Sequence, residues 1–138
     1  MTVYVDSNYW IYWMDRRQSE HRFVSKAMRS AIREGILLNF TTIIEIAHYF
    51  RDLPEPEFSS RMGKLRNLQT LVLKELDSAT TNKALELLSR YANVGIGGRD
   101  AIILATMQLN GVKRILTHDK DFRRVKGIRV IDRIPTQL

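Results

Sequence analysis

The chain contains no cysteine, which excludes disulfide bonds, thiolate metal sites and cysteine nucleophiles. Histidine is also scarce, with three residues in a chain of 138. His21, His48 and His118 are scattered and lack the short spacing of a zinc-binding pair. If this protein binds a metal ion, carboxylates must therefore supply most of the ligands.

Long apolar runs are missing as well. No segment approaches the roughly 18 consecutive apolar residues that a membrane-spanning helix needs. The N-terminus enters a strand pattern without the basic stretch and cleavage site of a secretory signal. We therefore expect a soluble, cytoplasmic protein that does not bind a membrane. Its 138 residues, 44% of them hydrophobic, suffice for one core, so we expect a single domain over residues 1–138.

Several catalytic and nucleotide-binding motifs are absent too. The chain has no GxxxxGK[ST] phosphate loop, no GxGxxG after its first strand and no GxSxG elbow. No local pattern supports a Ser-His-Asp triad. These absences leave metal-assisted chemistry as the best-supported class.

Positive charge is abundant. Twenty-two Lys and Arg stand against fifteen Asp and Glu, which gives a net charge of +7 and a pI near 10.0. Such a surface suits a polyanion, and nucleic acid is the common case. An ordinary solvated surface rich in Lys and Arg explains the same numbers, so charge alone leaves both interpretations open.

Apolar spacing and turn residues alternate strand and helix along the chain. Strands are expected at residues 2–5, 36–40, 70–76, 113–116 and 128–131. Helices are expected after residue 6 and at residues 20–34, 41–51, 57–67, 78–92, 99–110 and 119–125. Strands separated by helices require right-handed crossovers. The pattern predicts an α/β fold, a three-layer α/β/α sandwich around a central parallel sheet of about five strands.

Four acidic residues occupy positions that a parallel sheet could bring to one edge. Asp6 and Asp119 each follow a strand, Asp100 lies in the first turn of a very apolar helix, and Glu45 lies on the helix at 41–51. Clustered carboxylates repel one another unless they are protonated or bridged by a cation, usually a hard divalent ion. Each acid also has a structural explanation, namely helix capping, the helix dipole or a solvated helix face.

The helix that carries Glu45 is compatible with two interpretations. On a helix at 41–51, Ile43, Ile44 and Ile46 fall on one face and Glu45 falls on the opposite face. The same pattern is expected for a helix with a solvated polar face and for a helix that lines a cleft. The functional interpretation of Glu45 therefore depends on the presence of the other three acids.

An aromatic cluster follows Asp6. It holds both tryptophans of the chain and comprises Tyr9, Trp10, Tyr12 and Trp13. These rings could stack on RNA bases. We favour packing in the core or in a protein interface, where aromatic residues are common.

Taken in order, the segments VDSNYW, TTIIEIAHYF, GGRDAIILATMQLNG and ILTHDKDF carry Asp6, Glu45, Asp100 and Asp119. Together they resemble the PIN-domain ribonucleases, most closely the VapC-type toxins of type II toxin–antitoxin systems. The resemblance covers essentially the whole chain, and no acidic position of the family pattern is missing. Its most specific part is the acid beside an apolar helix followed by T-x-D-x-D-F.

The resemblance implies a site and an activity. Asp6, Glu45, Asp100 and Asp119 would be the catalytic acids that bind Mg²⁺ or Mn²⁺. Auxiliary residues would be Asp121 and the hydroxyl residues Ser7, Thr42 and Thr117. The implied activity is a metal-dependent endoribonuclease that activates water and leaves 5′-phosphate and 3′-hydroxyl ends. The implied partners are an RNA substrate, a cognate antitoxin and a second copy of the chain in a homodimer.

Basic residues flank two of the acids. Arg99 precedes Asp100, and Lys120, Arg123 and Arg124 follow Asp119. They could position RNA phosphates beside the site. A solvated helix face accounts for each of them equally well.

Three other functions remain open. A PIN nuclease of housekeeping RNA maturation would use the same chemistry, and an inactive PIN domain would only bind. A phosphorylated receiver-like domain also places acids at strand ends, but it needs an acidic pair after the first strand. Ser7 and Asn8 follow Asp6 here, which disfavours that interpretation.

Overall fold

A computed structural model describes residues 1–136, and within this range five strands form one sheet in the order β3-β2-β1-β4-β5. The strands are β1 (Val3–Val5), β2 (Ile36–Asn39), β3 (Leu71–Lys74), β4 (Arg114–Leu116) and β5 (Arg129–Ile131). Every pairing between neighbouring strands is parallel. The predicted parallel sheet is confirmed.

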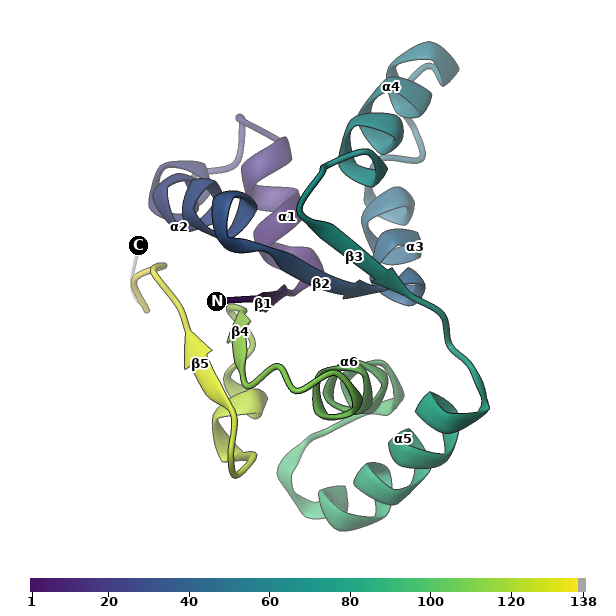
Figure 1. Ribbon diagram of the computed structural model, residues 1–138. Helices are drawn as coiled ribbons and strands as arrows, with labels where there is room; N and C mark the ends of the chain where they lie inside the picture. The colour runs from purple at the N-terminus through teal and green to yellow at the C-terminus, as the bar shows by residue number, and fades with distance from the viewer. Residues whose placement is uncertain (137–138) are drawn as a thin grey trace.

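Helices cover both faces of this sheet. They are α1 (Ser7–Met14), α2 (His21–Glu34), α3 (Phe40–Tyr49), α4 (Glu55–Arg66), α5 (Ser78–Arg90) and α6 (Gly98–Leu109), with short 3₁₀ helices η1 (Ala92–Val94) and η2 (Lys120–Arg124). Figure 1 shows α1, α2 and α3 on one side of the sheet and α5 and α6 on the other. The three-layer α/β/α arrangement is thus confirmed.

The central strands are buried because helices pack on both of their faces. Every residue of β1 and β2 is buried, as expected for the nearly continuous apolar runs VYV and ILLN. The edge strand β3 instead alternates, with Val72 and Lys74 exposed. Burial therefore decreases from the middle of the sheet to this edge.

The chain reverses its direction of travel across the sheet between β1 and β4. It moves outward from β1 through β2 to β3, then crosses back so that β4 lies on the other side of β1. The backbone N–H of Asp6 donates to the carbonyl of Leu116 at 2.9 Å, which joins the ends of these two strands. Such a switch point is where open α/β sheets commonly bind ligands.

The aromatic cluster belongs mainly to the core. Tyr9 and Trp10 are fully buried, and the indole N–H of Trp10 donates to the carbonyl of Val5 at 3.1 Å. Tyr12 and Trp13 are half-buried against the same core. The packing interpretation is confirmed for Tyr9 and Trp10, whose rings are not free to stack on RNA.

Some element boundaries differ from the prediction for local reasons. The strand predicted at 36–40 ends at Asn39, because the Asn39 side chain accepts from the N–H of Thr41 at 3.0 Å and caps α3. Helix α4 begins at Glu55 rather than at residue 57, since proline at Pro56 is tolerated in a first helical turn. The predicted loop at 93–98 overlaps the 3₁₀ helix η1.

The predicted orientation of α3 was wrong at Ile44, which is 68% exposed. The face that packs inward includes Thr42, whose hydroxyl lies 2.7 Å from the hydroxyl of Tyr4 in β1. Glu45 stands three residues after Thr42, so it lies on the same side of the helix. This rotation turns Glu45 toward the end of the sheet.

Among the helices of residues 1–136, none combines the length and the apolar character that a bilayer span would need.

Candidate active site

Asp6 is the most deeply buried acid at the end of the sheet, with a side chain that is 0% exposed. It follows β1 and caps α1, where its Oδ1 accepts from the backbone N–H of Ser7 at 2.7 Å. Its Oδ2 accepts from the hydroxyl of Thr117 at 2.7 Å. A buried carboxylate is tolerated only with such partners, and they fix both oxygens of Asp6 in place.

Thr117 connects Asp6 to Asp119. Its hydroxyl oxygen, which donates to Asp6, also accepts from the backbone N–H of Asp119 at 3.0 Å. Asp119 caps η2 by accepting from the N–H of Asp121 at 2.9 Å. One threonine hydroxyl therefore sets the relative positions of the acids that follow β1 and β4.

Asp100 and Glu45 reach the same place from α6 and α3. Asp100 lies in the first turn of α6 and accepts a long hydrogen bond of 3.4 Å from the N–H of Gly97. Glu45 is 29% exposed, but its Oε1 is buried and has no hydrogen-bond partner within residues 1–136. Burial raises the pKa of both carboxyl groups above the ordinary value, and attraction by the Arg99 guanidinium offsets only part of that rise.

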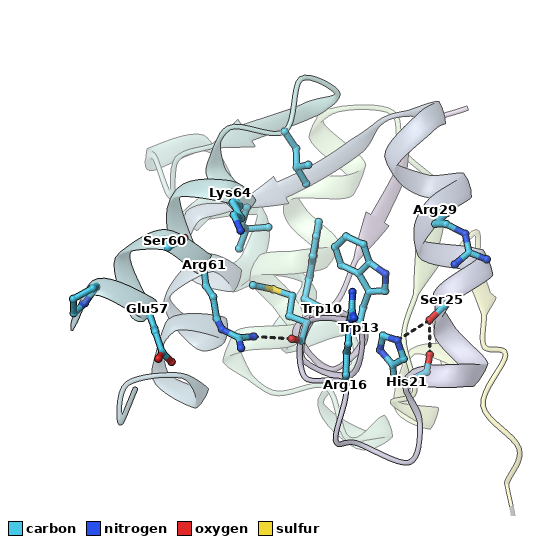
Figure 2. A pocket seen from close by; sticks show the side chains of 14 residues that line it. Trp10, Trp13, Arg16, His21, Ser25, Arg29, Glu57, Ser60, Arg61 and Lys64 are labelled. Atoms are coloured by element: carbon cyan, nitrogen blue, oxygen red, sulfur yellow. Dashed lines mark hydrogen bonds between the residues drawn. The ribbon is translucent and has the colours of Figure 1, made fainter. Parts of the chain in front are cut away.

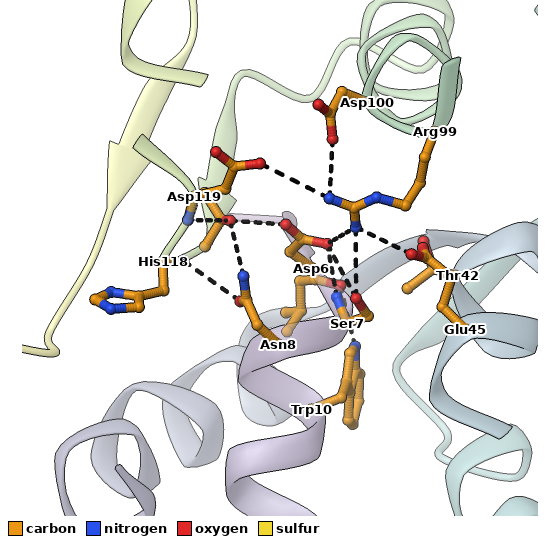
Figure 3. A network of polar contacts seen from close by, with 12 residues as sticks. Asp6, Ser7, Asn8, Trp10, Thr42, Glu45, Arg99, Asp100, His118 and Asp119 are labelled. Atoms are coloured by element: carbon orange, nitrogen blue, oxygen red, sulfur yellow. Dashed lines mark hydrogen bonds and ion pairs between the residues drawn. The ribbon is translucent and has the colours of Figure 1, made fainter. Parts of the chain in front are cut away.

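The guanidinium of Arg99 lies in the middle of the four carboxylates, as Figure 3 shows. Its Nη1 is 3.0 Å from Oδ1 of Asp6 and 3.1 Å from Oε2 of Glu45. Its Nη2 is 3.0 Å from Oδ1 of Asp100 and 3.7 Å from Oδ2 of Asp119. The structure thus brings all four sequence-predicted acids to one cation.

The donor chemistry of this cluster fits Mg²⁺ or Mn²⁺, since both ions prefer oxygen ligands. The buried, unpartnered Oε1 of Glu45 supports that fit, because an orphaned carboxylate oxygen is costly unless a ligand satisfies it. With Arg99 between the acids, no three His, Asp or Glu side chains of residues 1–136 form a ready metal-binding group. The four carboxylates are therefore suitable ligands for Mg²⁺ or Mn²⁺. In this structure the Arg99 guanidinium contacts their oxygens.

The predicted hydroxyl residues divide into two kinds. Ser7 and Thr117 both contact Asp6, Ser7 through a long hydroxyl contact of 3.5 Å. Thr42 is buried and pairs with the hydroxyl of Tyr4 rather than with an acid. Ser7 and Thr117 can therefore orient Asp6 directly, whereas Thr42 supports the helix that carries Glu45.

Asp121 stands apart from the contacts of Arg99. Its carboxyl group packs against Gly95, where an added Cβ would lie 3.0 Å from Cγ of Asp121. Gly95 also has a φ of +84°, which favours glycine. Asp121 thus touches the loop that leads into α6.

Sequence patterns did not indicate the part played by Asn8 and Asp132. Asn8 accepts from the N–H of His118 at 3.3 Å, and Asp132 lies 2.7 Å from Nδ1 of His118 and accepts from the hydroxyl of Tyr9 at 2.8 Å. These contacts hold the segment that carries Asp119. The one local signal is the position of Asn8 in the first turn after Asp6, but its partner His118 is 110 residues away.

The predicted basic residues occupy two different environments. Lys120, Arg123 and Arg124 are exposed on η2 immediately after Asp119, and within residues 1–136 none forms an ion pair within 4.0 Å. Arg99 is instead engaged with the acids. The surface charge beside the site is therefore supplied by η2.

A groove of about 820 Å³ is lined by residues of α1, α2 and α4 (Figure 2), and none of the four acids lines it. Trp13 and Met14 contribute partly exposed apolar surface to it, and the buried side chains of Trp10 and Leu65 lie behind this surface in the core. Its basic lining residues are Arg16, Arg29, Arg61 and Lys64. Glu57 is the acidic residue among those that line the groove, so positive charge dominates its polar parts.

Comparisons with known proteins agree with this architecture. Residues 3–128 match the PIN domain. A comparison with curated proteins found no match.

Solved structures show the same fold at low sequence identity. The VapC20 toxin of Mycobacterium tuberculosis, described as cleaving the sarcin-ricin loop, has a TM-score of 0.75 and 15% identity over 88% of this chain and 92% of its own. VapBC2 from Rickettsia felis, bound to a promoter DNA fragment, has a TM-score of 0.72 and 14% identity over 96% of this chain and 98% of its own.

FitAcB from Neisseria gonorrhoeae has a TM-score of 0.74 and 18% identity over 95% of this chain and 96% of its own. These structures share the fold of the present protein, and the PIN domain match covers nearly its whole length. The chain therefore belongs to the PIN domain family.

Proposed function

We propose that this protein is a metal-dependent endoribonuclease and the toxin of a toxin–antitoxin pair. The observation that carries the proposal is the convergence of Asp6, Glu45, Asp100 and Asp119 from four separate segments at the switch point of the sheet. The family match supports it, as do the toxins among the similar structures. The proposal takes residues 1–138 as one nuclease domain that acts in the cytoplasm.

The chemistry follows from the donor set. Hydrolysis of a phosphodiester needs an activated water, neutralised charge on the scissile phosphate and a stabilised leaving oxygen, all of which bound Mg²⁺ or Mn²⁺ can supply. Asp6 presents a carboxylate whose orientation is fixed by Ser7 and Thr117. Glu45 offers an oxygen that has no other partner within the described chain. The protein thus provides rigid ligands and needs no nucleophile of its own.

RNA binding is assigned to the surface next to the acids. Lys120, Arg123 and Arg124 are exposed on η2, directly after Asp119. Their charges can hold phosphates near the site without reading the base sequence. The net charge of +7 favours the approach of any polyanion.

The antitoxin is assigned to the groove between α1, α2 and α4. Similar structures include a toxin–antitoxin complex from Klebsiella pneumoniae. An apolar surface that includes Trp13 and Met14, with Arg16, Arg29 and Lys64 around it, suits a segment with apolar and acidic side chains.

A homodimer is also proposed. Exposed apolar residues such as Ile44 and Leu85 support it, because a second copy could cover them.

Cleavage of RNA by the purified protein tests the enzymatic proposal. We expect cleavage of single-stranded RNA with Mg²⁺ or Mn²⁺ and none with excess chelator. Asp6→Asn and Asp100→Asn should abolish cleavage while circular dichroism shows an unchanged fold. Asp52→Asn is the matched control, because Asp52 is exposed and lies between α3 and α4. Cleavage by Asp100→Asn at the wild-type rate would contradict the assignment.

Expression in a bacterial host separates the toxin from a nuclease of RNA maturation. A toxin should arrest growth when expressed alone, and Asp6→Asn should not. Harmless expression of soluble, active protein would favour RNA maturation. The receiver-like alternative gains no support from the PIN domain match.

A further inference from the structure

Arg99 differs from the other paired arginines of the described chain in the number of acids it contacts. Arg17, Arg90 and Arg114 each pair with one acidic residue. Arg99 lies within 4.0 Å of four acids, which come from α3, α6 and the segments after β1 and β4. One side chain therefore holds together the whole proposed metal site.

The guanidinium and a divalent ion would require the same oxygens. The atoms nearest to Arg99 include Oδ1 of Asp6, Oε2 of Glu45 and Oδ1 of Asp100. A metal ion placed among these oxygens would also stand against a positive charge that is only partly screened by solvent. Occupation of the site by the metal and by the guanidinium is therefore mutually unfavourable.

The side chain of Arg99 has space to move out of the acid cluster. Its side chain is 37% exposed, so it reaches the acids from the open side of the site and not from the core. The preceding glycines, Gly97 and Gly98, have open space where a side chain would begin. A rotamer change of Arg99 alone would take the guanidinium out of the cluster without unfolding α6.

We propose that Arg99 is the internal counter-ion of the acid site and competes with the catalytic metal, so that metal binding requires the guanidinium to move outward. This inference rests on the proposed function, which supplies the metal. In the metal-free protein Arg99 neutralises part of the repulsion among the four carboxylates. After metal binding it stands at the mouth of the site, where its planar fork matches a phosphate of the bound RNA.

A competing role and a purely structural role of Arg99 predict different effects of its removal on metal binding. If Arg99 competes with the metal, its removal should strengthen metal binding even though it weakens the metal-free fold. We expect Arg99→Gln to bind Mn²⁺ more tightly than the wild type, by on the order of tenfold, because a partly buried cation no longer has to be displaced. Isothermal titration calorimetry with Mn²⁺ alone measures this directly.

A second variant and a matched control sharpen the test. Arg99→Lys keeps the charge, but a single ammonium cannot span four carboxylates, so it should also bind Mn²⁺ more tightly, by a few-fold. Arg33→Gln removes the same charge from the exposed surface of α2 just before β2, at the edge of the sheet opposite the acids, and should leave the Mn²⁺ affinity within about twofold of the wild type. Thermal unfolding should show a lower Tm for metal-free Arg99→Gln and recovery of that Tm on addition of Mn²⁺.

The outcomes separate this inference from the enzymatic proposal. Tighter Mn²⁺ binding by Arg99→Gln supports the inference even if the wild type fails to cut RNA, in which case only the proposed function is lost. Equal or weaker Mn²⁺ binding by Arg99→Gln and Arg99→Lys overturns the inference even if the wild type cuts RNA. An equal gain for Arg33→Gln also overturns it, because the effect would then come from net charge.

Discussion

The hydroxyl of Thr117 donates a hydrogen bond of 2.7 Å to Oδ2 of Asp6, although the two residues are 111 positions apart. The bond is possible because β1 and β4 are parallel neighbours whose carboxyl ends meet. The same hydroxyl accepts from the N–H of Asp119. Thr117 is therefore the residue through which the strand pairing sets the geometry of two acids.

Replacing Thr117 by valine tests this positioning role. Valine keeps the shape but leaves Oδ2 of Asp6 without its donor, so we expect metal-dependent RNA cleavage to fall by on the order of 10- to 100-fold. The free energy of unfolding should fall by only about 1–3 kcal/mol. Thr117→Ser retains the hydroxyl and should keep most of the activity. Cleavage kinetics with Mn²⁺ measure the effect, and wild-type kcat/KM in Thr117→Val would refute the role.

Glu45→Gln tests whether α3 contributes a ligand. The substitution removes one of the four negative charges, so we expect Mn²⁺ affinity to fall by on the order of tenfold in calorimetry. The metal-free variant should unfold at a higher temperature than the wild type, because burial raises the pKa of Glu45 and thus disfavours its charged form. Glu75→Gln, exposed just after β3, should change neither the Mn²⁺ affinity nor the unfolding temperature. Unchanged Mn²⁺ affinity in Glu45→Gln would remove Glu45 from the ligand set.

Asp15 gives a pH-dependent prediction away from the site. Its carboxylate accepts from Nε of Arg17 at 3.0 Å and from the hydroxyl of Tyr49 at 2.8 Å. Chiefly because of the bond from Arg17, the pKa of Asp15 lies well below its usual range in the folded protein. A folded pKa below the unfolded one stabilises the protein above the unfolded pKa, and this stabilisation is lost as the pH falls.

We therefore expect Asp15→Asn to lower the free energy of unfolding by about 1–2 kcal/mol near pH 7, a modest value because Arg17 is exposed. The difference from the wild type should shrink below about pH 4, where unfolded Asp15 becomes protonated. Urea unfolding near pH 7 and near pH 3 measures both values. An equal difference at the two pH values would show that the charge of Asp15 is not the cause.

The assignment of the groove to the antitoxin predicts an effect of charge reversal. Arg61→Glu combined with Lys64→Glu should weaken binding of the cognate antitoxin by at least about tenfold, because both residues line the groove and would repel an acidic partner. RNA cleavage by the free toxin should be unchanged. Lys113→Glu is an exposed control outside the groove. Surface plasmon resonance that shows equal affinity for all variants would place the antitoxin elsewhere.

Much of the fold follows from local patterns in the sequence. The buried strands β1 and β2 are short apolar runs next to capping residues such as Asp6 and Asn39. The stop of α2 at Gly35, which has a φ of +121°, is likewise a local signal. Strands separated by helices then leave a parallel sheet as the natural arrangement.

The orientation of α3 shows where local pattern is insufficient. Ile44 is apolar and was expected to face the core, yet it is exposed, while Glu45 faces the sheet end. Hydrophobicity favours burial of Ile44, but the helix rotates so that Thr42 meets Tyr4 of β1. That contact joins residues 38 positions apart, so no local periodicity could reveal it.

The sequence by itself determined the alternation of strands and helices and the candidate acids, because these depend on the spacing of residues that are near one another in the chain. Only the tertiary structure decided that Arg99 stands among those acids and that Thr117 orients Asp6. Arg99 was expected at the RNA surface from its neighbours in the sequence. Its actual partners include Asp6 and Glu45, which come within reach only when the strands pair and α3 and α6 pack on opposite faces of the sheet, so long-range packing sets which charges meet.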